Sequence, residues 1–299
     1  MKILVSGSSG LIGSAAVHHL TKQGHQVSAL VRVPRKAKPG DVPWSPQRPL
    51  APDALSPFDA VIHLAGKTVA GRWTEKSKAE IRESRARGTR VIAEAVAQAF
   101  RSGGCPRVLV SASAIGYYGS RGDEMLTEES RAGNGFLAET GREWESATGA
   151  AGHAGVRVVM PRIGLVLSTR GGALAKMLPA FRMGVAGRIG SGHQYWSWIT
   201  LDDLVRVMEF ALVDERVSGA VNAVAPEATT NAEFTKVLAS VLHRPALFPL
   251  PAYVARLAFG AMADELLLSS QRVEPAKLNA LGFKFQDADL RSALERVLR

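Results

Sequence analysis

Cysteine is almost absent from this chain of 299 residues, in which Cys105 is the only one. A single cysteine cannot form an internal disulfide, and this scarcity is typical of proteins kept in a reducing compartment. Long apolar runs are also missing, so no segment is predicted to span a bilayer. The N-terminus has no basic region followed by a separate apolar block and cleavage site. We therefore expect no signal peptide and a cytoplasmic location.

Acidic residues are outnumbered, with 27 Asp and Glu against 37 Lys and Arg, which gives a net charge of +10. Such an excess is compatible with nucleic-acid binding. However, the basic residues are spread along the chain without an aromatic–basic recognition motif. The densest cluster is equally well explained as a solvated helix face near an anionic cofactor. We expect a small-molecule substrate, no nucleic acid, no membrane and no metal, and a homodimer is compatible with the sequence. The cluster consists of Arg82, Arg85, Arg87 and Arg90.

The first 32 residues carry the strongest signal in the chain. Residues 2–5 form an apolar run, a glycine-rich stretch follows, and a helical pattern then leads to a second apolar run at residues 26–32. This order of strand, glycine turn, helix and strand is typical of a dinucleotide-binding fold, in which a pyrophosphate lies on the helix N-terminus. The alternative is a glycine-rich turn in another kind of α/β protein. The expected cofactor contacts in the turn are Gly7, Ser9, Gly10, Leu11, Ile12 and Gly13.

The end of the second expected strand indicates which dinucleotide binds. Folds that prefer NAD place a carboxylate there, where it accepts a hydrogen bond from the ribose 2′-hydroxyl. This chain has Arg32, followed by Arg35, Lys36 and Lys38. Because a guanidinium can bind a 2′-phosphate with two hydrogen bonds, we expect NADP(H), held by Arg32 and Arg35. The alternative is a solvated basic loop.

The rest of the chain predicts a doubly wound α/β fold. Seven prolines between residues 33 and 58 predict an irregular connection, which either folds over the cofactor or crosses the surface loosely. Further on, buried strands at 59–66, 107–111 and 156–160 alternate with helices at 74–100, capped by Thr74, and at 136–150. Strands that alternate with helices imply a parallel sheet with helices on both faces. The hydrophobic fraction of 46% is enough for a large core.

After Pro161 the pattern changes to shorter elements. We expect a helix at 173–183, a strand at 196–199 whose Trp196 and Trp198 face the same side, and a helix to residue 212 capped by Asp202. A strand at 220–224, a helix from Asn231 and three short helical stretches follow. We therefore divide the chain into a cofactor-binding Rossmann domain at 1–165, completed by about 200–224, and a smaller α/β substrate-binding portion at 166–299.

Several of these segments resemble the extended short-chain dehydrogenase/reductase superfamily, over essentially the whole chain. Residues 7–13, 63–66, 83–89, 111–119, 161–164 and 198–204 are similar to its motifs, while residues 190–194 and 263–271 are closest to an atypical subgroup. This subgroup is called sugar-nucleotide epimerase family proteins or cell-division inhibitors. The resemblance implies the cofactor contacts His63, Leu64, Ala65, Gly66, Arg85, Ser111, Ala112, Pro161 and Ile163.

One departure from the superfamily concerns catalysis. Its Tyr-x-x-x-Lys pair belongs at the start of the helix after the serine strand, where this chain has Phe136 and Thr140 or, one residue on, Leu137 and Gly141. In neither register is there a phenol or an ammonium, and Phe cannot relay a proton. The substitutes that we consider are Tyr117 or Tyr118, with Ser111 or Ser113 orienting a carbonyl, and also Glu139 and His193.

Two functions are compatible with these residues. The first is an NADP(H)-dependent oxidoreductase or epimerase that acts on an unknown carbonyl or sugar-nucleotide-like substrate with an unusual proton donor. The second is an NADP(H)-binding regulatory protein without turnover. The serine strand and the C-terminal portion favour the enzyme, whereas the missing tyrosine and lysine favour the regulator.

Overall fold

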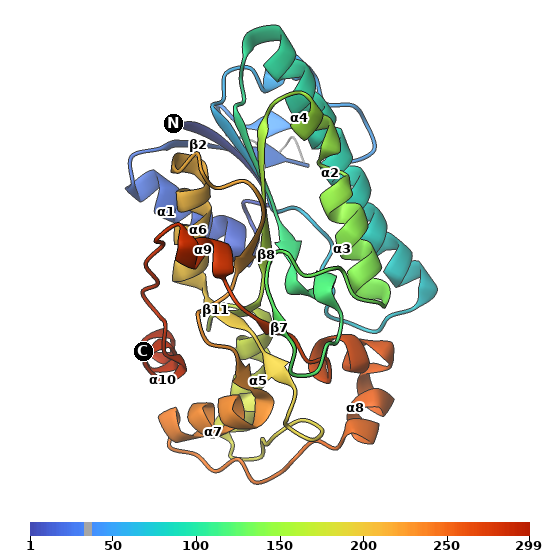
Figure 1. Cartoon of the computed structure of the whole chain (residues 1–299), viewed down its shortest axis with the longest axis vertical. Coiled ribbons are helices and arrows are strands. Elements are labelled where there is room, and N and C mark those ends of the chain that lie inside the picture. Colours follow the sequence, from blue (N-terminus) through green and yellow to red (C-terminus); the bar gives the residue numbers. More distant parts are fainter. Residues whose placement is uncertain (33–37) are drawn as a thin grey trace.

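The computed structural model of the chain describes residues 1–32 and 38–299, with a twisted parallel sheet at its centre (Figure 1). The strand order is β12-β8-β5-β4-β1-β2-β3, and β6 lies beside β8. The pairs in this sheet are parallel, as the alternation of strands and helices predicted. The strands are β1 Lys2–Ser6, β2 Gln26–Val31, β3 Val42–Pro43, β4 Ala60–His63, β5 Val108–Ser111, β6 Ser113–Ala114, β8 Arg157–Ile163 and β12 Gly219–Ala223.

Helices cover both faces of this sheet (Figure 1), which confirms the doubly wound fold. On one face lie α1 (Leu11–Lys22) and α6 (Leu201–Val213). On the other lie α2 (Glu75–Gly103), α3 (Phe136–Ser146) and α4 (Gly149–His153). The helix α2 begins where we expected, because the Thr74 side chain accepts a hydrogen bond from the Ser77 amide.

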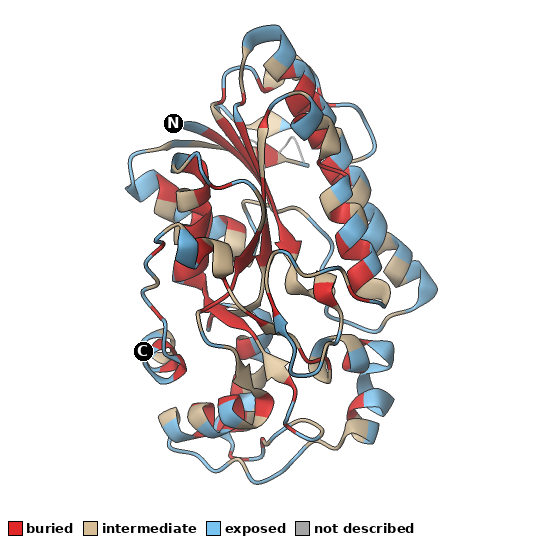
Figure 2. Ribbon diagram, in the orientation of Figure 1, coloured by how far each residue is buried: buried red, intermediate tan, exposed pale blue. Residues whose placement is uncertain are grey.

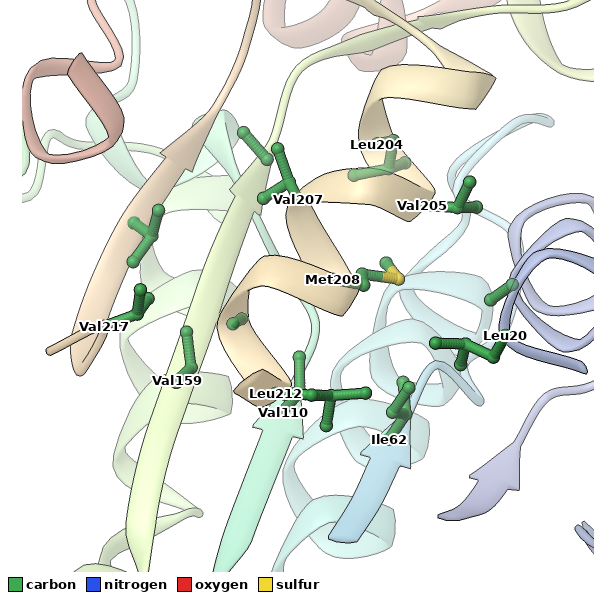
Figure 3. Packing of buried hydrophobic residues seen from close by; sticks show 14 of the residues in the cluster. Leu20, Ile62, Val110, Val159, Leu204, Val205, Val207, Met208, Leu212 and Val217 are labelled. Atoms are coloured by element: carbon green, nitrogen blue, oxygen red, sulfur yellow. The ribbon is translucent and has the colours of Figure 1, made fainter. Parts of the chain in front are cut away.

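The core is divided by the sheet into two apolar layers, which Figure 2 shows as buried strands between half-buried helices. Successive side chains of a strand face opposite sides, so Ile3 and Val5 join one layer and Leu4 joins the other. Figure 3 shows the first layer, where Met208 and Leu212 of α6 pack over the strands. Burial of this much apolar surface is the main force that holds helices and sheet together.

Shorter elements form the C-terminal portion, which packs beyond the carboxyl ends of the central strands (Figure 1). Its helices enclose a third apolar cluster around Phe181, Trp198 and Phe234. Its elements are β9 Leu165–Leu167, α5 Gly172–Arg182, β10 Tyr195–Trp196, β11 Trp198–Thr200, β13 Thr229–Thr230, α7 Asn231–Val241, α8 Ala252–Phe259, the π-helical turn η4 Ala263–Leu267, β14 Arg272–Val273, α9 Ala276–Ala280 and α10 Leu290–Leu298. The strand β14 pairs with β7 Met125–Leu126, from the earlier part of the chain. The chain also has two short 3-10 turns, η2 Pro52–Ala54 and η3 Ile115–Tyr118.

Three local expectations were wrong. The segment at 196–199 breaks at Ser197, whose carbonyl accepts from Leu165 N, so Trp196 lies in β10 and Trp198 in β11 of a different sheet. The segment at 136–150 forms two helices instead of one. The cap of α6 is Thr200 instead of Asp202.

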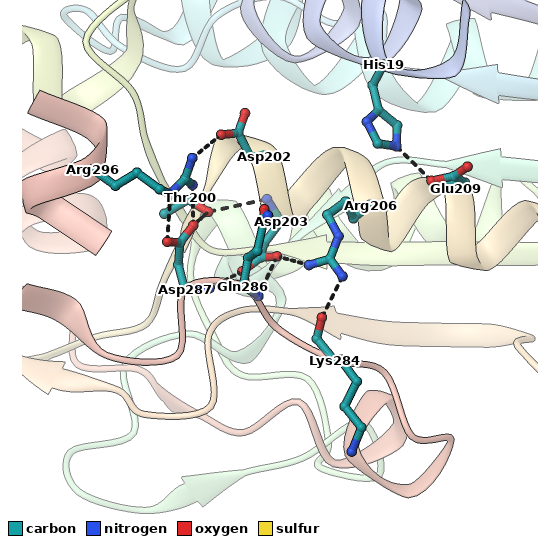
Figure 4. A network of polar contacts seen from close by, with 10 residues as sticks. All are labelled: His19, Thr200, Asp202, Asp203, Arg206, Glu209, Lys284, Gln286, Asp287 and Arg296. Atoms are coloured by element: carbon teal, nitrogen blue, oxygen red, sulfur yellow. Dashed lines mark hydrogen bonds and ion pairs between the residues drawn. The ribbon is translucent and has the colours of Figure 1, made fainter. Parts of the chain in front are cut away.

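Asp202 instead belongs to a polar network that holds the C-terminus against α6 (Figure 4). Arg296 of α10 binds both Asp202 and Asp287, and the Thr200 hydroxyl donates to Asp287 at 2.7 Å. The buried Asp203 carboxylate accepts from the backbone amides of residues 286 and 287. Because each buried carboxylate is matched by several donors, the network can be accommodated in the interior.

The proline-rich connection packs against the core in the part that the structure describes, residues 38–58. Residues 42–43 add a strand beside β2, and Trp44, Leu50 and Leu55 are buried against α2 and the sheet. Of the two alternatives for this segment, a loosely crossing loop is therefore excluded for residues 42–58. The buried Trp44 ring lies edge-on to His63, with the ring centres 6.0 Å apart.

The glycine-rich turn between β1 and α1 depends on close approaches of the backbone. Gly7 has φ +70°, and a Cβ there would lie 2.9 Å from Ala65 N at the end of β4. A Cβ at Gly13 would lie 2.0 Å from the Gly7 carbonyl oxygen, whereas one at the exposed Gly10 would lie 3.3 Å from the same atom. Gly7 and Gly13 are thus required by the turn itself, whereas Gly10 is required only if something must approach from outside.

His63 stabilises the loop that follows β4. Its Nδ1 lies 2.6 Å from the Ser6 hydroxyl oxygen, which also accepts from Leu64 N and Ala65 N. The ring is completely buried, and its Nε2 has no partner among the described residues. Burial disfavours the charged imidazolium and lowers the pKa of His63 to about 4.

We predict that Gly13→Ala destabilises the protein by about 3 kcal/mol, because the new methyl group collides with the Gly7 carbonyl. The matched variant Gly10→Ala should cost less than about 1 kcal/mol, since only a small adjustment at the start of α1 is needed. Urea unfolding followed by circular dichroism measures both. Equal losses in the two variants would show that the turn has a different geometry.

We also predict that His63 makes the protein less stable in mild acid. As the pH falls below the unfolded pKa of 6.5, the unfolded chain binds a proton that the folded chain refuses until about pH 4. This difference amounts to about 2 to 3 kcal/mol of the free energy of unfolding at pH 4.5. His63→Asn should flatten the dependence between pH 7 and 4.5, whereas His153→Asn, at an exposed position, should not. Parallel curves for His63→Asn and the wild type would contradict this.

Candidate functional site

The N-terminus of α1 is built to face an anion. Gly10 is the N-cap and provides no capping side chain, and the first turn contains no acidic residue. The first amides of the helix, which lack partners within the helix, therefore point outward from the turn that Gly7 and Gly13 shape. This is the arrangement in which α/β folds hold phosphate groups, at the carboxyl ends of the parallel strands.

A cavity of about 480 Å³ lies beside this turn, where β2 and β4 end. It adjoins the turn, because Ala65, which lines the cavity, is the residue whose amide abuts Gly7, although none of residues 7–13 is among the lining residues. The loop 44–47 from the proline-rich connection forms one wall, and the first half of α2 forms another. The lining residues are Arg32, Trp44, Pro46, Gln47, Ala65, Gly66, Lys67, Thr68, Glu80, Glu83, Ser84 and Arg87.

Arg32 differs from the other cations of this cavity. Lys67 pairs with Glu80, and Arg87 pairs with Glu83 at 3.0 Å. No carboxylate of residues 1–32 or 38–299 pairs with Arg32, whose exposed side chain lines the cavity. A charged guanidinium without a counter-charge is the group that an additional phosphate would satisfy. The expected contact Arg35, and Lys36 beside it, lie outside the described residues.

Arg85, expected to touch the cofactor, supports the 64–67 loop instead. Its Nη1 donates to the Lys67 carbonyl at 2.9 Å, and its guanidinium lies against Gly66 and over the Trp144 ring. Burial lowers the pKa of Arg85 to about 10. His63 is likewise a support, since its buried ring does not line the cavity. Of the four loop residues proposed, only Ala65 and Gly66 line it.

The remaining expected contacts lie around the carboxyl ends of the central strands. Leu11 packs against Gly171 and Gly172, where α5 begins. Ser111 is buried at the end of β5, and its hydroxyl has no partner within the described part of the chain. Because buried hydroxyl groups normally have a hydrogen-bond partner, the Ser111 hydroxyl is a group that a bound ligand would satisfy. The others are the exposed Ser9, the half-buried Ile12, Leu64 and Ile163, and the buried Ala112 and Pro161.

An ion pair between Arg162 and Glu145 forms the centre of the candidate catalytic region. Arg162, at the end of β8, donates from Nε and Nη2 to the two carboxylate oxygens of Glu145 on α3, both at 2.8 Å. The Ser113 hydroxyl donates to the same carboxylate at 2.7 Å. Burial alone would lower the pKa of Arg162, but its bonds and attraction to Glu145 outweigh this and raise the pKa above the usual value. Arg162 therefore stays charged.

Tyr118, one of the two tyrosines expected to be catalytic, is a structural part of this network. Its side chain is fully buried, its hydroxyl donates to Asn222 Oδ1 at 2.7 Å, and it accepts from Arg162 at 2.9 Å. Burial raises the pKa of Tyr118 to about 12, more than Arg162 and Asn222 lower it. A phenol so enclosed does not reach a substrate, so this expectation does not fit the geometry.

The surroundings of Tyr117 differ from those of the enclosed Tyr118. It is half-buried, and its hydroxyl makes no hydrogen bond to any residue that the structure describes. The Arg162 guanidinium lies over the face of its ring, 3.6 Å from the ring centre. A Cβ at Gly141 would lie 3.2 Å from Tyr117 Cα, so the absence of a side chain at position 141 makes room for Tyr117.

The start of α3 carries no acid or base on its own inner face. The Phe136 ring packs on Trp73, with centres 5.0 Å apart, and Leu137 packs against Gly116. Thr140 is buried. The exposed Glu139 and His193 are not part of the ion-pair network.

A carboxylate from the C-terminal portion nevertheless reaches this helix end. Glu265 of η4 accepts from Phe136 N at 3.0 Å and from Leu137 N at 2.7 Å. The sequence offered no local signal for this contact, because the partners are separated by 128 and 129 residues. Glu145 and Trp44 were also not foreseen, although a glutamate eight residues after Leu137, two helical turns on, suggests a shared face.

No group of three or more His, Cys, Asp or Glu residues in the described ranges is placed to hold a metal ion. In the same ranges, none of the helices combines the length and the apolar character needed to cross a membrane.

Comparison with known proteins gives the same picture of the fold. The chain matches the model of the NAD dependent epimerase/dehydratase family over residues 3–223 and a domain of unknown function over residues 250–297. Epimerase family protein Mb2239 of Mycobacterium bovis is 42% identical over 294 residues, 98% of this chain and 96% of that one. Human epimerase family protein SDR39U1 is 35% identical over 302 residues, which cover 100% of both chains.

The crystal structure of human epimerase family protein SDR39U1 (isoform 2) with NADPH superposes on this chain with a TM-score of 0.89. The two are 34% identical, and the match covers 99% of each. From its sequence and its structure, this chain belongs to the NAD dependent epimerase/dehydratase family, among the epimerase family proteins that resemble SDR39U1.

Proposed function

We propose that this protein is an NADP(H)-dependent oxidoreductase or epimerase in which Tyr117 replaces the usual catalytic tyrosine. The observation that carries the cofactor assignment is the cavity with Arg32 at the end of β2, next to the glycine turn. The solved NADPH complex of the human relative supports it. Residues 1–165, completed by 200–224, would hold the cofactor, and residues 166–299 would cover the substrate.

The chain's own groups fit this cofactor. The first amides of α1 would hold the pyrophosphate, Arg32 the 2′-phosphate, and the buried Ser111 hydroxyl offers a hydrogen bond that no described protein group takes up. Ala112, Pro161 and Ile163 would lie on the nicotinamide side. When bound, NADPH supplies a hydride to a carbonyl carbon, and NADP⁺ accepts one in the reverse direction.

Tyr117 is the group that we assign to proton transfer. Its hydroxyl is not engaged by other described residues, and the positive charge of Arg162 lies 3.6 Å above its ring. A cation at this distance favours the ionised phenolate and so replaces, in electrostatic terms, the missing lysine. The Glu145 carboxylate partly offsets this charge but holds Arg162 in place.

The hydroxyl at Oη of Tyr117 would donate its proton to the substrate oxygen during reduction and regain one from solvent. In oxidation the proton would move in the opposite direction. We assign Ser113 no direct contact with the substrate, because its hydroxyl donates its hydrogen bond to Glu145. It is therefore a positioning residue for the ion pair.

A regulatory NADP(H)-binding protein without turnover is the second candidate. The specific observation in its favour is that α3 has Phe136 and Thr140 or, one residue on, Leu137 and Gly141 where the superfamily has its tyrosine and lysine. This candidate needs the same cofactor cavity but no proton donor, so substitution at Tyr117 separates the two.

We predict that Arg32→Ala weakens NADPH binding roughly ten- to a hundredfold and leaves NADH binding unchanged. The loss corresponds to about 1.5 to 3 kcal/mol for a charge-assisted contact to phosphate. Isothermal titration calorimetry measures both affinities, and Arg101→Ala at the far end of α2 is the matched control. If the native protein bound NADH as tightly as NADPH, the assignment of the 2′-phosphate to this cavity would be wrong.

We predict that Tyr117→Phe lowers kcat by about 10²-fold or more while NADPH affinity changes less than twofold, since the variant loses only the proton donor. The assay is oxidation of NADPH with a panel of carbonyl compounds, and Tyr253→Phe on the exposed side of α8 is the control. Full activity of Tyr117→Phe would rule out its role. Absence of turnover with every compound, together with firm NADPH binding, would favour the regulatory protein.

A further inference from the structure

A second cavity, of about 370 Å³, lies in the C-terminal portion between α5 and α7. Its size falls in the range of small-molecule sites. The bottom of Figure 1 shows α5 and α7 with the segments that join them to neighbouring elements. The lining residues are Met177, Ala180, Phe181, Val185, Ala186, Gly187, Ile189, Trp196, Asn231, Phe234, Thr235, Phe248, Pro249 and Leu250.

None of these lining side chains is charged. Three of them carry polar groups: Asn231, whose Oδ1 accepts from Ile189 N, the buried Thr235, and Trp196, whose buried Nε1 has no partner among the described residues. Four cations adjoin lining residues in the sequence, namely Lys176, Arg182, Arg188 and Lys236, and none of them lines the cavity; the Arg188 side chain lies against Gly192. Two large apolar side chains at the cavity, Val185 and Phe248, are more than half exposed to solvent. Because no lining side chain is charged, the cavity favours hydrocarbon groups over a phosphate.

This cavity adjoins the turn that reaches the catalytic region. The Gln194 side chain donates to the carbonyls of Ile189, which lines the cavity, and of Leu267, which ends η4. Gly190 approaches the Leu268 side chain so closely that a Cβ would lie 2.8 Å from it. One loop therefore separates the apolar cavity from η4.

On the other side of that turn, Glu265 places a negative charge at the start of α3. Its carboxylate accepts from two of the free amides at this helix end, those of Phe136 and Leu137. The neighbouring Gly135 has φ +101°, and a Cβ there would lie 3.2 Å from the carboxylate. Leu137, whose amide Glu265 binds, packs against Gly116, the residue before Tyr117. The carboxylate thus borders the region that we assign to proton transfer.

From these two independent observations we infer that the substrate is an uncharged, largely apolar carbonyl compound or alcohol. Its hydrocarbon part occupies the cavity between α5 and α7, and Glu265 disfavours anions such as nucleoside diphosphates. The inference rests on the proposed function, since it names the substrate class for that site. It gives the C-terminal portion a different chemistry from the one that the family's name suggests.

The test uses protein loaded with NADPH, and the fluorescence of the bound cofactor is recorded first. Nile red, a neutral apolar dye, then reports occupancy of the cavity, and 2-decanone competes with it. UDP-glucose binding is measured by calorimetry. We expect 2-decanone to displace the dye and to bind at least tenfold more tightly than UDP-glucose.

Two variants locate the site. Ala180→Phe, which fills the cavity from α5, should weaken 2-decanone at least tenfold, whereas Ala173→Phe, exposed on the same helix, should change it less than twofold. Val185→Glu, at an exposed position on the rim, should weaken it similarly without crowding the interior, and so covers the case that Ala180→Phe misfolds. Glu265→Gln should tighten UDP-glucose binding at least threefold, because it removes the repulsion.

Tighter binding of UDP-glucose than of 2-decanone would overturn the inference, as would 2-decanone binding that neither cavity variant weakens. Unchanged UDP-glucose affinity in Glu265→Gln would remove Glu265 from the account. The binding of NADPH is measured before either ligand is added. If the protein does not bind NADPH, the proposed function is contradicted and the inference about the substrate is not. Titration of cofactor-free protein with Nile red would then show whether the cavity binds apolar compounds.

Discussion

The buried ion pair between Arg162 and Glu145 holds the catalytic region together. It joins β8 to α3, takes up the Ser113 hydroxyl, and binds the hydroxyl of Tyr118 while the guanidinium covers the ring of Tyr117. Breaking a buried pair by removing one partner strands a charge in the interior and typically costs several kcal/mol. The pair therefore fixes β8 against α3, and it is also the source of the positive charge on which the proposed role of Tyr117 depends.

The loss of the usual tyrosine and lysine is compensated in space rather than in sequence. Gly141 leaves room for Tyr117, and Arg162 supplies a fixed positive charge. Glu265, from the far end of the chain, occupies the amides at the start of α3. Glu265 thus places a negative charge at the start of α3, and the cavity between α5 and α7 has no charged side chain. With the substrate class that we propose, the scaffold would bind its nucleotide cofactor and an apolar substrate.

Local sequence patterns predicted most of the fold, whereas contacts between residues far apart in the sequence could not be predicted from it. The glycine turn, the alternating strands and the Thr74 cap depend on neighbouring residues, and Arg32 was found because its distance from the glycines is set by one helix and one strand. Adjacent Tyr117 and Tyr118 could not be told apart, since only the packing shows which one faces Asn222. Thr200 and Asp202 are both residue types that commonly cap helices. In the structure Asp202 pairs instead with Arg296, which lies 94 residues beyond it. Glu265 had no signal at all.

The most direct test of the account is a crystal structure of this protein with NADPH bound. We predict that the 2′-phosphate lies against Arg32 in the cavity at the end of β2, and that the nicotinamide lies at the carboxyl ends of β5 and β8 with the Tyr117 hydroxyl on its substrate side. A cofactor whose 2′-phosphate lies away from Arg32, or whose nicotinamide is separated from Tyr117 by α3, would contradict the account.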